Sequence, residues 1–195
     1  MDQVREKPWL AHYDPGVPPE IQVPDIPLWR FLEESARRFP QNVALEFLGK
    51  TLSYQELWGF ARRFAQGLKD LGVRPGDRVA IMLPNSPQFV IAFYGTLLAG
   101  GVGVNVNPLY TPRELRHQLA DAGAETLVIL DHLLPRYLEV EKEVPVKRVV
   151  VTGIKDFLPF PKNLLYPLKA KRDGLPLGFP KREGFHAFAE LLKRP

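Results

Sequence analysis

The chain has 195 residues, of which 45% are hydrophobic and 25% charged, a balance typical of a soluble globular protein. It contains no cysteine, which excludes disulfides, thiolate catalysis and cysteine metal sites. The net charge of +4 is unevenly placed: seven basic and two acidic residues between Lys155 and Arg182 give +5, so the remainder sums to −1. This distribution excludes a generally basic surface for nucleic acid, and no nucleic-acid partner is expected.

The first 27 residues are rich in proline and show little periodic pattern. We expect an extended arm that lies along the domain or along a partner. The first ten residues (MDQVREKPWL) carry charge and proline without an apolar stretch, so they are not a secretory signal. A cytoplasmic location is therefore expected.

Residues 28–70 predict a helix, a hairpin and a second helix. Apolar residues recur at helical intervals from Leu28 until Pro40. Two short strands at 43–47 and 50–52 predict a small hairpin. Ser53 and Glu56 have the spacing of a capping box, which opens the next helix.

Alternating strands and helices between residues 78 and 131 organise the chain. Strands are expected at three apolar runs: Arg78 to Leu83, Val102 to Val106 and Glu125 to Leu130. Ser86 and Thr111 are expected to cap the two intervening helices, which glycines then close. Strands separated by helices of this length need crossovers. The fold class is therefore α/β, with a mostly parallel sheet covered by helices on both faces.

The pattern weakens after Asp131. It predicts a helix over 133–143, a fourth parallel strand over 148–152, an irregular proline-rich excursion over 155–180 and an amphipathic helix over 185–193. We divide the chain into an arm (1–27), an α/β subdomain (28–154) and a basic, aromatic and proline-rich segment with a terminal helix (155–195). The apolar faces in this last segment have no evident partner in the chain, so exposed apolar area is expected there.

Four blocks resemble the N-terminal part of the acyl-adenylate-forming family, specifically its long-chain fatty acyl-CoA synthetases. They are residues 51–57 (TLSYQEL), 71–80 (LGVRPGDRVA), 83–86 (LPNS) and 107–115 (NPLYTPREL). Residues 156–167 (DFLPFPKNLLYP) further resemble the bacterial fatty-acid branch. The resemblance covers nearly the whole chain and implies the N-terminal subdomain of an acyl-CoA synthetase-like fold.

The resemblance implies a two-step reaction. A fatty acid and ATP with Mg²⁺ give an acyl-adenylate and pyrophosphate, and coenzyme A then displaces AMP. The family's phosphate loop and later catalytic blocks are not found, so we expect an N-terminal fragment that is inactive alone and binds none of these cofactors tightly. Its expected partners are the remainder of the synthetase chain, the fatty acid and a second copy in a homodimer. Two alternatives stay open: a non-catalytic membrane- or partner-binding module, and a ligase for another carboxylic acid.

The loops at the carboxyl ends of the predicted strands supply the substrate-edge candidates. In a parallel sheet these ends share one edge, so the loops at 84–87, 107–111 and 131–132 should converge. One interpretation is that Asn85, Asn107 and Tyr110 face the acyl or nucleotide site of the complete enzyme. The other is that the neighbouring Ser86 and Thr111 are helix caps, while the two asparagines bond loop backbone.

The basic, aromatic segment supplies the membrane or partner contact candidates. They are Phe157, Leu158, Phe160, Lys162, Leu164, Leu165, Tyr166, Lys169, Lys171 and Arg172. Apolar anchors flanked by cations suit the interface of an anionic membrane, which would place the protein peripherally at the inner face of the membrane. The alternative is that the aromatic residues pack on another domain and the lysines form a solvated rim.

No catalytic, cofactor-binding or metal residue is assigned. The four histidines lack a metal-binding spacing, and the adjacent Asp131 and His132 lack an accompanying nucleophile motif. The uncharged stretch from Asn85 to Pro112 is interrupted by glycine, asparagine and proline. It is therefore not expected to span a membrane, which takes about 20 predominantly apolar residues.

Overall fold

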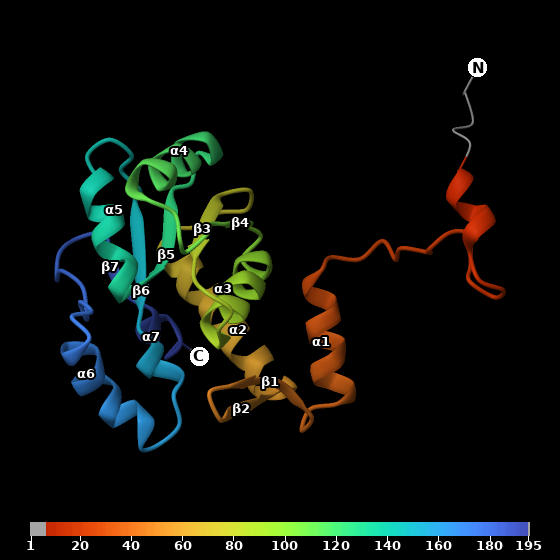
Figure 1. The fold of residues 1–195 in the computed structure, drawn as a ribbon, viewed down its shortest axis with the longest axis horizontal. Helices are drawn as coiled ribbons and strands as arrows, with labels where there is room; N and C mark the ends of the chain where they lie inside the picture. The colour runs from red at the N-terminus through yellow and green to blue at the C-terminus, as the bar shows by residue number, and fades with distance from the viewer. Residues whose placement is uncertain (1–6, 195) are drawn as a thin grey trace.

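The computed structural model describes residues 7–194, which are built around a five-stranded sheet (Figure 1). The strands are β3 (Arg78–Met82), β4 (Val102–Asn105), β5 (Thr126–Leu130), β6 (Arg148–Thr152) and β7 (Phe185–Ala187). They lie in the order β4-β3-β5-β6-β7, and every neighbouring pair is parallel. All five residues of β5 are buried, as expected for a strand covered on both faces. The predicted parallel α/β fold is confirmed.

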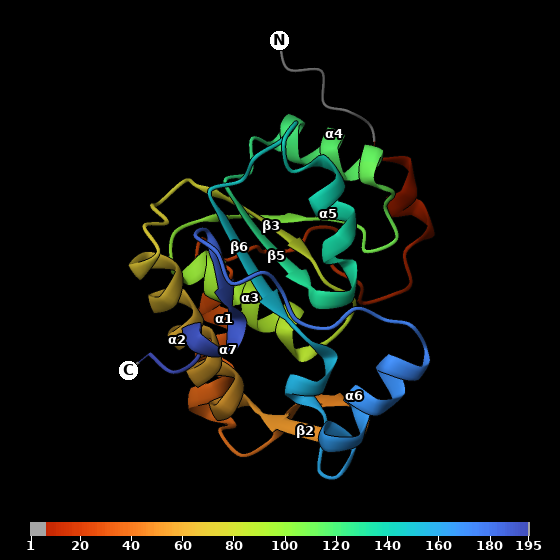
Figure 2. The ribbon, with the colours of Figure 1, turned by 90° about the vertical axis from the view of Figure 1, so that its left-hand side faces the viewer.

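Helices cover both faces of the sheet (Figures 1 and 2). They are α1 (Trp29–Arg38), α2 (Tyr54–Asp70), α3 (Pro87–Leu98), α4 (Pro112–Ala122), α5 (Leu134–Val140), α6 (Lys162–Arg172) and α7 (Phe188–Leu191). The helices α1, α2, α3 and α7 pack together, and α4 packs with α5. No helix in the part of the chain that the structure describes is both long and apolar enough to cross a bilayer.

The strand order creates a reversal at β3. The chain moves from β3 to its neighbour β4, then returns past β3 to β5. Because crossovers between parallel strands are almost always right-handed, these two connections place α3 and α4 on opposite faces of the sheet. The carboxyl end of β3 is therefore a topological switch point, where ligand sites of open α/β sheets are found.

The hairpin and the helix caps follow from local sequence. The strands β1 (Val43–Phe47) and β2 (Lys50–Ser53) pair antiparallel, which confirms the predicted hairpin. The predicted capping boxes are also confirmed: the backbone N–H of Glu56 donates to Ser53 Oγ at 3.2 Å, and that of Glu114 donates to Thr111 Oγ1 at 3.4 Å.

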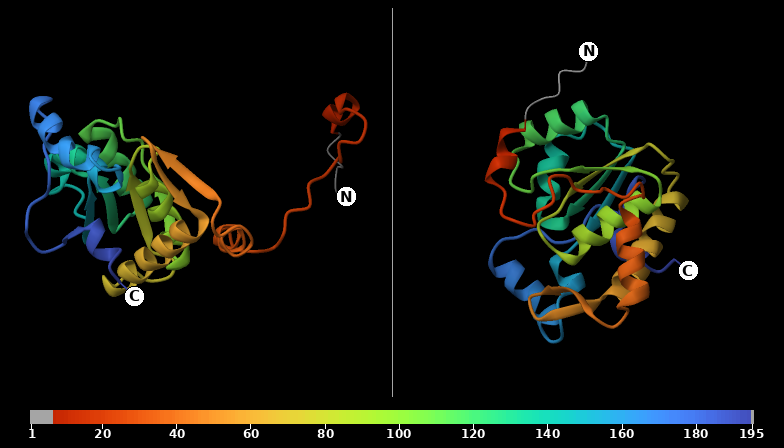
Figure 3. Two further views of the ribbon diagram at one scale, coloured as in Figure 1. Left: turned by 90° about the horizontal axis from the view of Figure 1, so that it is seen from below. Right: turned by 90° about the vertical axis from the view of Figure 1, so that its right-hand side faces the viewer.

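Residues 7–27 run away from the α/β body (Figures 1 and 3). They contain one short 3₁₀ helix, η1 (Pro8–His12), and an ion pair of 2.8 Å between Lys7 Nζ and Glu20 Oε1. The side chains of Ile21 and Val23 are 85% and 83% exposed. The described part of the arm therefore projects from its own domain instead of lying along it.

The carboxyl-terminal segment differs from the sequence expectation in two ways. At the stretch predicted to be irregular, one 3₁₀ helix, η3 (Ile154–Phe157), and a turn lead into an 11-residue helix, α6, which contains Pro167. The predicted terminal helix over 185–193 was wrong: its first three residues form β7, which pairs with β6 from Val149↔Phe185 onward, and α7 is a single turn. Phenylalanine and leucine at helical spacing concealed a strand that only its partner in the sheet can specify.

The apolar face predicted to lack a partner at this end is buried instead. Phe188 is 1% exposed and its ring centroid lies 4.7 Å from that of Phe64 in α2. Leu191 is 3% exposed and also packs on α2, where Gly67 lets the two helices approach closely. Phe188 and Leu191 thus belong to the core of the α/β body.

Candidate functional site at the carboxyl edge of the sheet

The predicted substrate-edge residues follow two neighbouring strands. Asn85 lies in the turn after β3 and is exposed, whereas Asn107 and Tyr110 lie in the loop after β4. The two loops start side by side because the backbone N–H of Val106 donates to the carbonyl of Ile81 in β3 at 3.0 Å. The structure thus brings the three candidates to one edge of the sheet, beside the switch point. Their contact with a ligand stays a prediction.

The polar groups of the loop after β4 are used to hold the loop itself. Asn107 Oδ1 accepts a hydrogen bond from the backbone N–H of Leu109 at 3.0 Å, an arrangement that fixes a turn. The guanidinium of Arg136, on α5, donates to the carbonyls of Pro108 and Tyr110 at 2.6 and 3.1 Å. The amide of Asn107 therefore bonds the backbone of its own loop, which is the second of the two interpretations above. Arg136 holds the same loop from α5.

Tyr110 also lines a groove of about 710 Å³ that runs along α4. The groove carries both signs of charge, from Arg113, Glu114 and Arg116 among others. The carboxylate of Glu114 accepts hydrogen bonds from the backbone and side chain of Thr111, and these bonds lower its pKa. Glu114 thus caps α4, and its lowered pKa makes the carboxylate a weaker proton acceptor.

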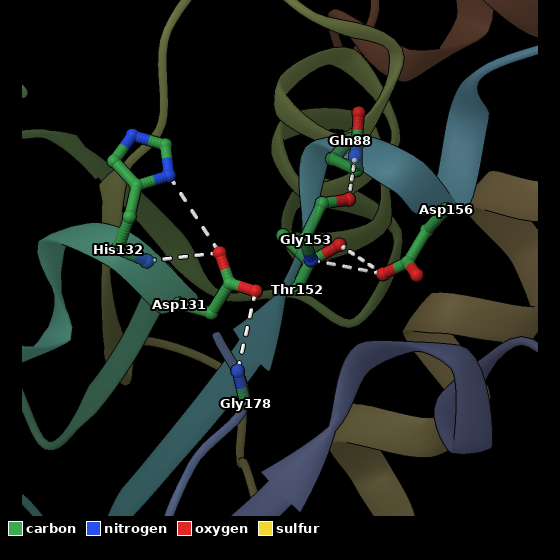
Figure 4. A network of polar contacts seen from close by, with 7 residues as sticks. All are labelled: Gln88, Asp131, His132, Thr152, Gly153, Asp156 and Gly178. Atoms are coloured by element: carbon green, nitrogen blue, oxygen red, sulfur yellow. Dashed lines mark hydrogen bonds and ion pairs between the residues drawn. The ribbon is translucent and has the colours of Figure 1, made fainter. Parts of the chain in front are cut away.

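A buried carboxylate stands at the end of β5 (Figure 4). Asp131 is 4% exposed, and its Oδ1 accepts from the backbone N–H of His132 at 2.8 Å. Its Oδ2 accepts from the backbone N–H of Gly178 at 3.4 Å. The imidazole Nδ1 of His132 lies 3.6 Å from Oδ1 and has no hydrogen-bond partner in the structure. Asp131 therefore joins the end of β5 to the segment that leads into β7.

A second carboxylate organises the end of β6. Asp156 Oδ2 accepts from Thr152 Oγ1 at 3.0 Å and from the backbone N–H of Gly153 at 2.9 Å. Gln88, fully buried at the start of α3, donates through Nε2 to the carbonyl of Gly153 at 2.9 Å. Figure 4 shows these contacts beside the Asp131 cluster. Together they tie the helix that follows β3 to the turn that follows β6.

Gly153 is the point at which the two clusters meet. A Cβ on this residue would lie 3.0 Å from Asp131 Oδ2, closer than ordinary van der Waals contact. A side chain here would require the carboxylate of Asp131 to shift by a few tenths of an ångström. Sequence reasoning assigned no site role to Gln88, Gly153 or Asp156, and it placed the loop of Asp131 at this edge without giving Asp131 a role there. Their position in the sequence could have identified them, because residues that directly follow buried parallel strands lie at the same edge of the sheet.

The membrane or partner contact candidates divide into buried and exposed members. Phe157 and Leu158 are 4% and 7% exposed, so their prediction as surface contacts was wrong. The ring of Phe157 packs edge-on against Phe60, at 5.6 Å between centroids, with the ammonium of Lys50 over it at 5.4 Å. Tyr166 is half-buried. The remaining candidates are exposed: Phe160, Lys162, Leu164, Leu165, Lys169, Lys171 and Arg172.

Comparison with known proteins decides the family. Residues 32–183 match the AMP-binding enzyme family, a stretch that includes the sheet edge and its switch point. The chain belongs to the AMP-binding enzyme family. Individual relatives are more than 40% identical in sequence to this chain, so they can be compared with it one by one.

Two curated relatives of this AMP-binding chain are bacterial long-chain-fatty-acid–CoA ligases. The protein from Bacillus subtilis is 43% identical over 189 residues, which cover 97% of this chain and 34% of that protein. The protein from Yersinia pestis is 41% identical over 163 residues, which cover 82% of this chain and 29% of that protein. The chain thus spans about a third of the length of the curated relatives it matches.

Among solved structures, an anthranilate CoA ligase in complex with anthranoyl-AMP has a TM-score of 0.70 and 22% sequence identity. The match covers 90% of this chain and 30% of that one. At this identity the likeness concerns the fold alone. It agrees with the parallel sheet and its two helical layers.

Proposed function

We propose that this chain provides the N-terminal part of an ATP-dependent long-chain fatty acid:CoA ligase, which converts a fatty acid, ATP and coenzyme A to acyl-CoA, AMP and pyrophosphate. The observation that carries the proposal is the identity of 43% and 41% with two long-chain-fatty-acid–CoA ligases across most of the chain. The fold likeness to an anthranilate CoA ligase is weaker in sequence, at 22% identity, and does not favour an aromatic acid over a fatty acid.

The carboxyl edge of the sheet is the part of this chain that would face the ligase active site. Its charged side chains Asp131, Asp156 and Arg136 bond the chain's own backbone or side chains. In the part of the chain that the structure describes, no group of three or more His, Asp or Glu side chains could hold a metal ion. We infer that this edge has a scaffolding role in the ligase, because its charged side chains hold the chain's own loops.

A chimera tests the proposal. The matching 189 residues of the Bacillus subtilis ligase are replaced by this chain, and exchange of labelled pyrophosphate into ATP is measured with palmitate. We expect fatty acid-dependent exchange by the chimera and none by the 195-residue chain alone. The parent ligase and a version lacking the replaced segment are the controls. A soluble, cooperatively folding chimera without exchange would contradict the proposal, and exchange by the chain alone would place the catalytic residues within it.

A further inference from the structure

The helix α6 has its apolar face reversed. In a helix on the surface of a globular protein the apolar stripe normally faces the core. In α6 the residue that faces the core is Ala170, which is 1% exposed, whereas Leu164, Leu165 and Leu168 are 64%, 57% and 70% exposed. With about 100° between successive residues, these leucines occupy an arc of roughly 100° on the solvent side. The core of this chain therefore does not bury the three leucines, and a partner would have to cover them.

Basic side chains flank this leucine stripe. On the same helical projection Lys171 lies at one border of the stripe, Lys169 and Lys162 lie at the other, and Arg172 lies within it. All four are exposed. The one acidic neighbour, Asp173, follows the helix and pairs with Arg172 at 3.5 Å. The helix therefore presents leucines together with several positive charges.

The surface extends beyond α6 to the tip of the hairpin. The ammonium of Lys162 donates to the carbonyl of Leu48 at 2.8 Å, which holds the β1–β2 turn against the start of the helix. Leu48 is 56% exposed, and Phe160, two residues before Lys162, is 78% exposed. In Figure 2 α6 and β2 lie on the same end of the molecule. We define the apolar basic surface by its exposed apolar residues and the basic residues that flank them. The apolar members are Leu48, Phe160, Leu164, Leu165 and Leu168, and the basic members are Lys162, Lys169, Lys171 and Arg172.

We propose that the apolar basic surface docks on an anionic lipid bilayer, with α6 lying in the plane of the membrane interface. Charge complementarity selects this occupant: leucine and phenylalanine side chains can enter the acyl boundary, while the flanking lysines remain at the level of anionic headgroups. The buried Phe157 and Leu158 anchor the segment to the protein on the other side. This inference is independent of the proposed ligase activity.

Vesicle sedimentation tests the docking with the full 195-residue chain. Wild type should sediment with vesicles that contain phosphatidylglycerol and stay in solution with vesicles of phosphatidylcholine alone, and added salt should weaken the binding. Equal binding to both kinds of vesicle, or to neither, would overturn the proposal.

Two pairs of matched variants locate the contact. Leu164→Ser/Leu168→Ser should weaken binding by tenfold or more, on the order expected for losing several buried methylenes, whereas the arm variant Ile21→Ser/Val23→Ser should not. Lys169→Gln/Lys171→Gln should weaken it by about 30-fold at low salt, whereas Lys69→Gln/Lys142→Gln, in α2 and in the turn after α5, should have little effect. Circular dichroism checks that each variant is folded. If the arm variant loses binding while the α6 variant keeps it, the surface is misassigned.

The remaining occupant is another part of a longer ligase that covers α6. The chimera with the Bacillus subtilis ligase separates this case from membrane docking, because the chimera and the isolated chain can be sedimented with the same vesicles. Sedimentation of the chimera with anionic vesicles, lost in its Leu164→Ser/Leu168→Ser form, supports the proposal. A chimera that stays in solution while the 195-residue chain binds shows that the ligase covers the surface, and overturns it.

Discussion

The substitution Gly67→Ala tests the close contact between α2 and α7, which was not predicted from the sequence. This glycine is buried in the last turn of α2, where alanine would normally be preferred by up to about 1 kcal/mol. A Cβ at this position would lie 2.6 Å from both Cβ and Cγ of Leu191 and 3.0 Å from its Cα. Ordinary contacts between carbon atoms are about 3.5–4.0 Å. Gly67→Ala therefore requires a displacement of about 1 Å that includes the backbone of α7.

The expected cost follows from two opposing effects. Overpacking in a filled core costs about 1–3 kcal/mol, and the contact with backbone places Gly67→Ala in the upper part of that range. After the gain in helix propensity, the net loss of unfolding free energy is about 1–2 kcal/mol. For a chain of this size that corresponds to a melting temperature lower by about 3–6 °C. Urea denaturation followed by circular dichroism measures the free energy directly.

Gly59→Ala on the same helix is the matched control. Its Cβ would meet the mobile guanidinium of Arg63, at 3.5 Å, and no backbone. It should raise the unfolding free energy by up to about 1 kcal/mol. If Gly67→Ala proves as stable as Gly59→Ala, then α7 does not pack on α2 as described, and the assignment of Phe188 and Leu191 to the core fails.

Three further changes test the caps, the last strand and the sheet edge. Ser53→Ala should lower the unfolding free energy by about 1 kcal/mol, because it removes one half of the capping box of α2, whereas Ser35→Ala, whose hydroxyl bonds within α1, should cost less. Burial, and secondarily Arg148, lowers the pKa of His186 in β7. The unfolded chain then binds the proton more readily, so stability should fall as pH decreases through about 6.5, and His186→Gln should flatten that part of the pH profile. Asn107→Ala in the active chimera should leave adenylation per folded molecule unchanged if the amide only holds its loop, whereas a selective loss of exchange would give Asn107 a role in ligand contact.

The elements predicted correctly are those that local chemistry specifies. Ser53 and Thr111 stand three residues before a glutamate, so their helices start where the capping boxes require. The strand β7 depends instead on pairing with β6, 36 residues earlier from Val149 to Phe185, and local spacing favoured a helix there. The edge network has the same character, since Gln88 and Gly153 are 65 residues apart in the chain. Sequence reasoning could name the edge but not the contacts across it.

The charges at that edge restrict what the proposed ligase can bind there with these residues alone. Asp131 and Asp156 place two carboxylates at the ends of neighbouring strands, and Arg136 is already bonded to two loop carbonyls. Coulomb repulsion between these carboxylates and an approaching triphosphate strengthens as water is excluded, whereas the guanidinium of Arg136 keeps its positive charge and offsets part of it. We therefore expect other segments of the proposed ligase to supply the remaining positive charge for ATP. The rigid contacts of Asp131 with Gly178 and of Gln88 with Gly153 keep the loops in place for those segments.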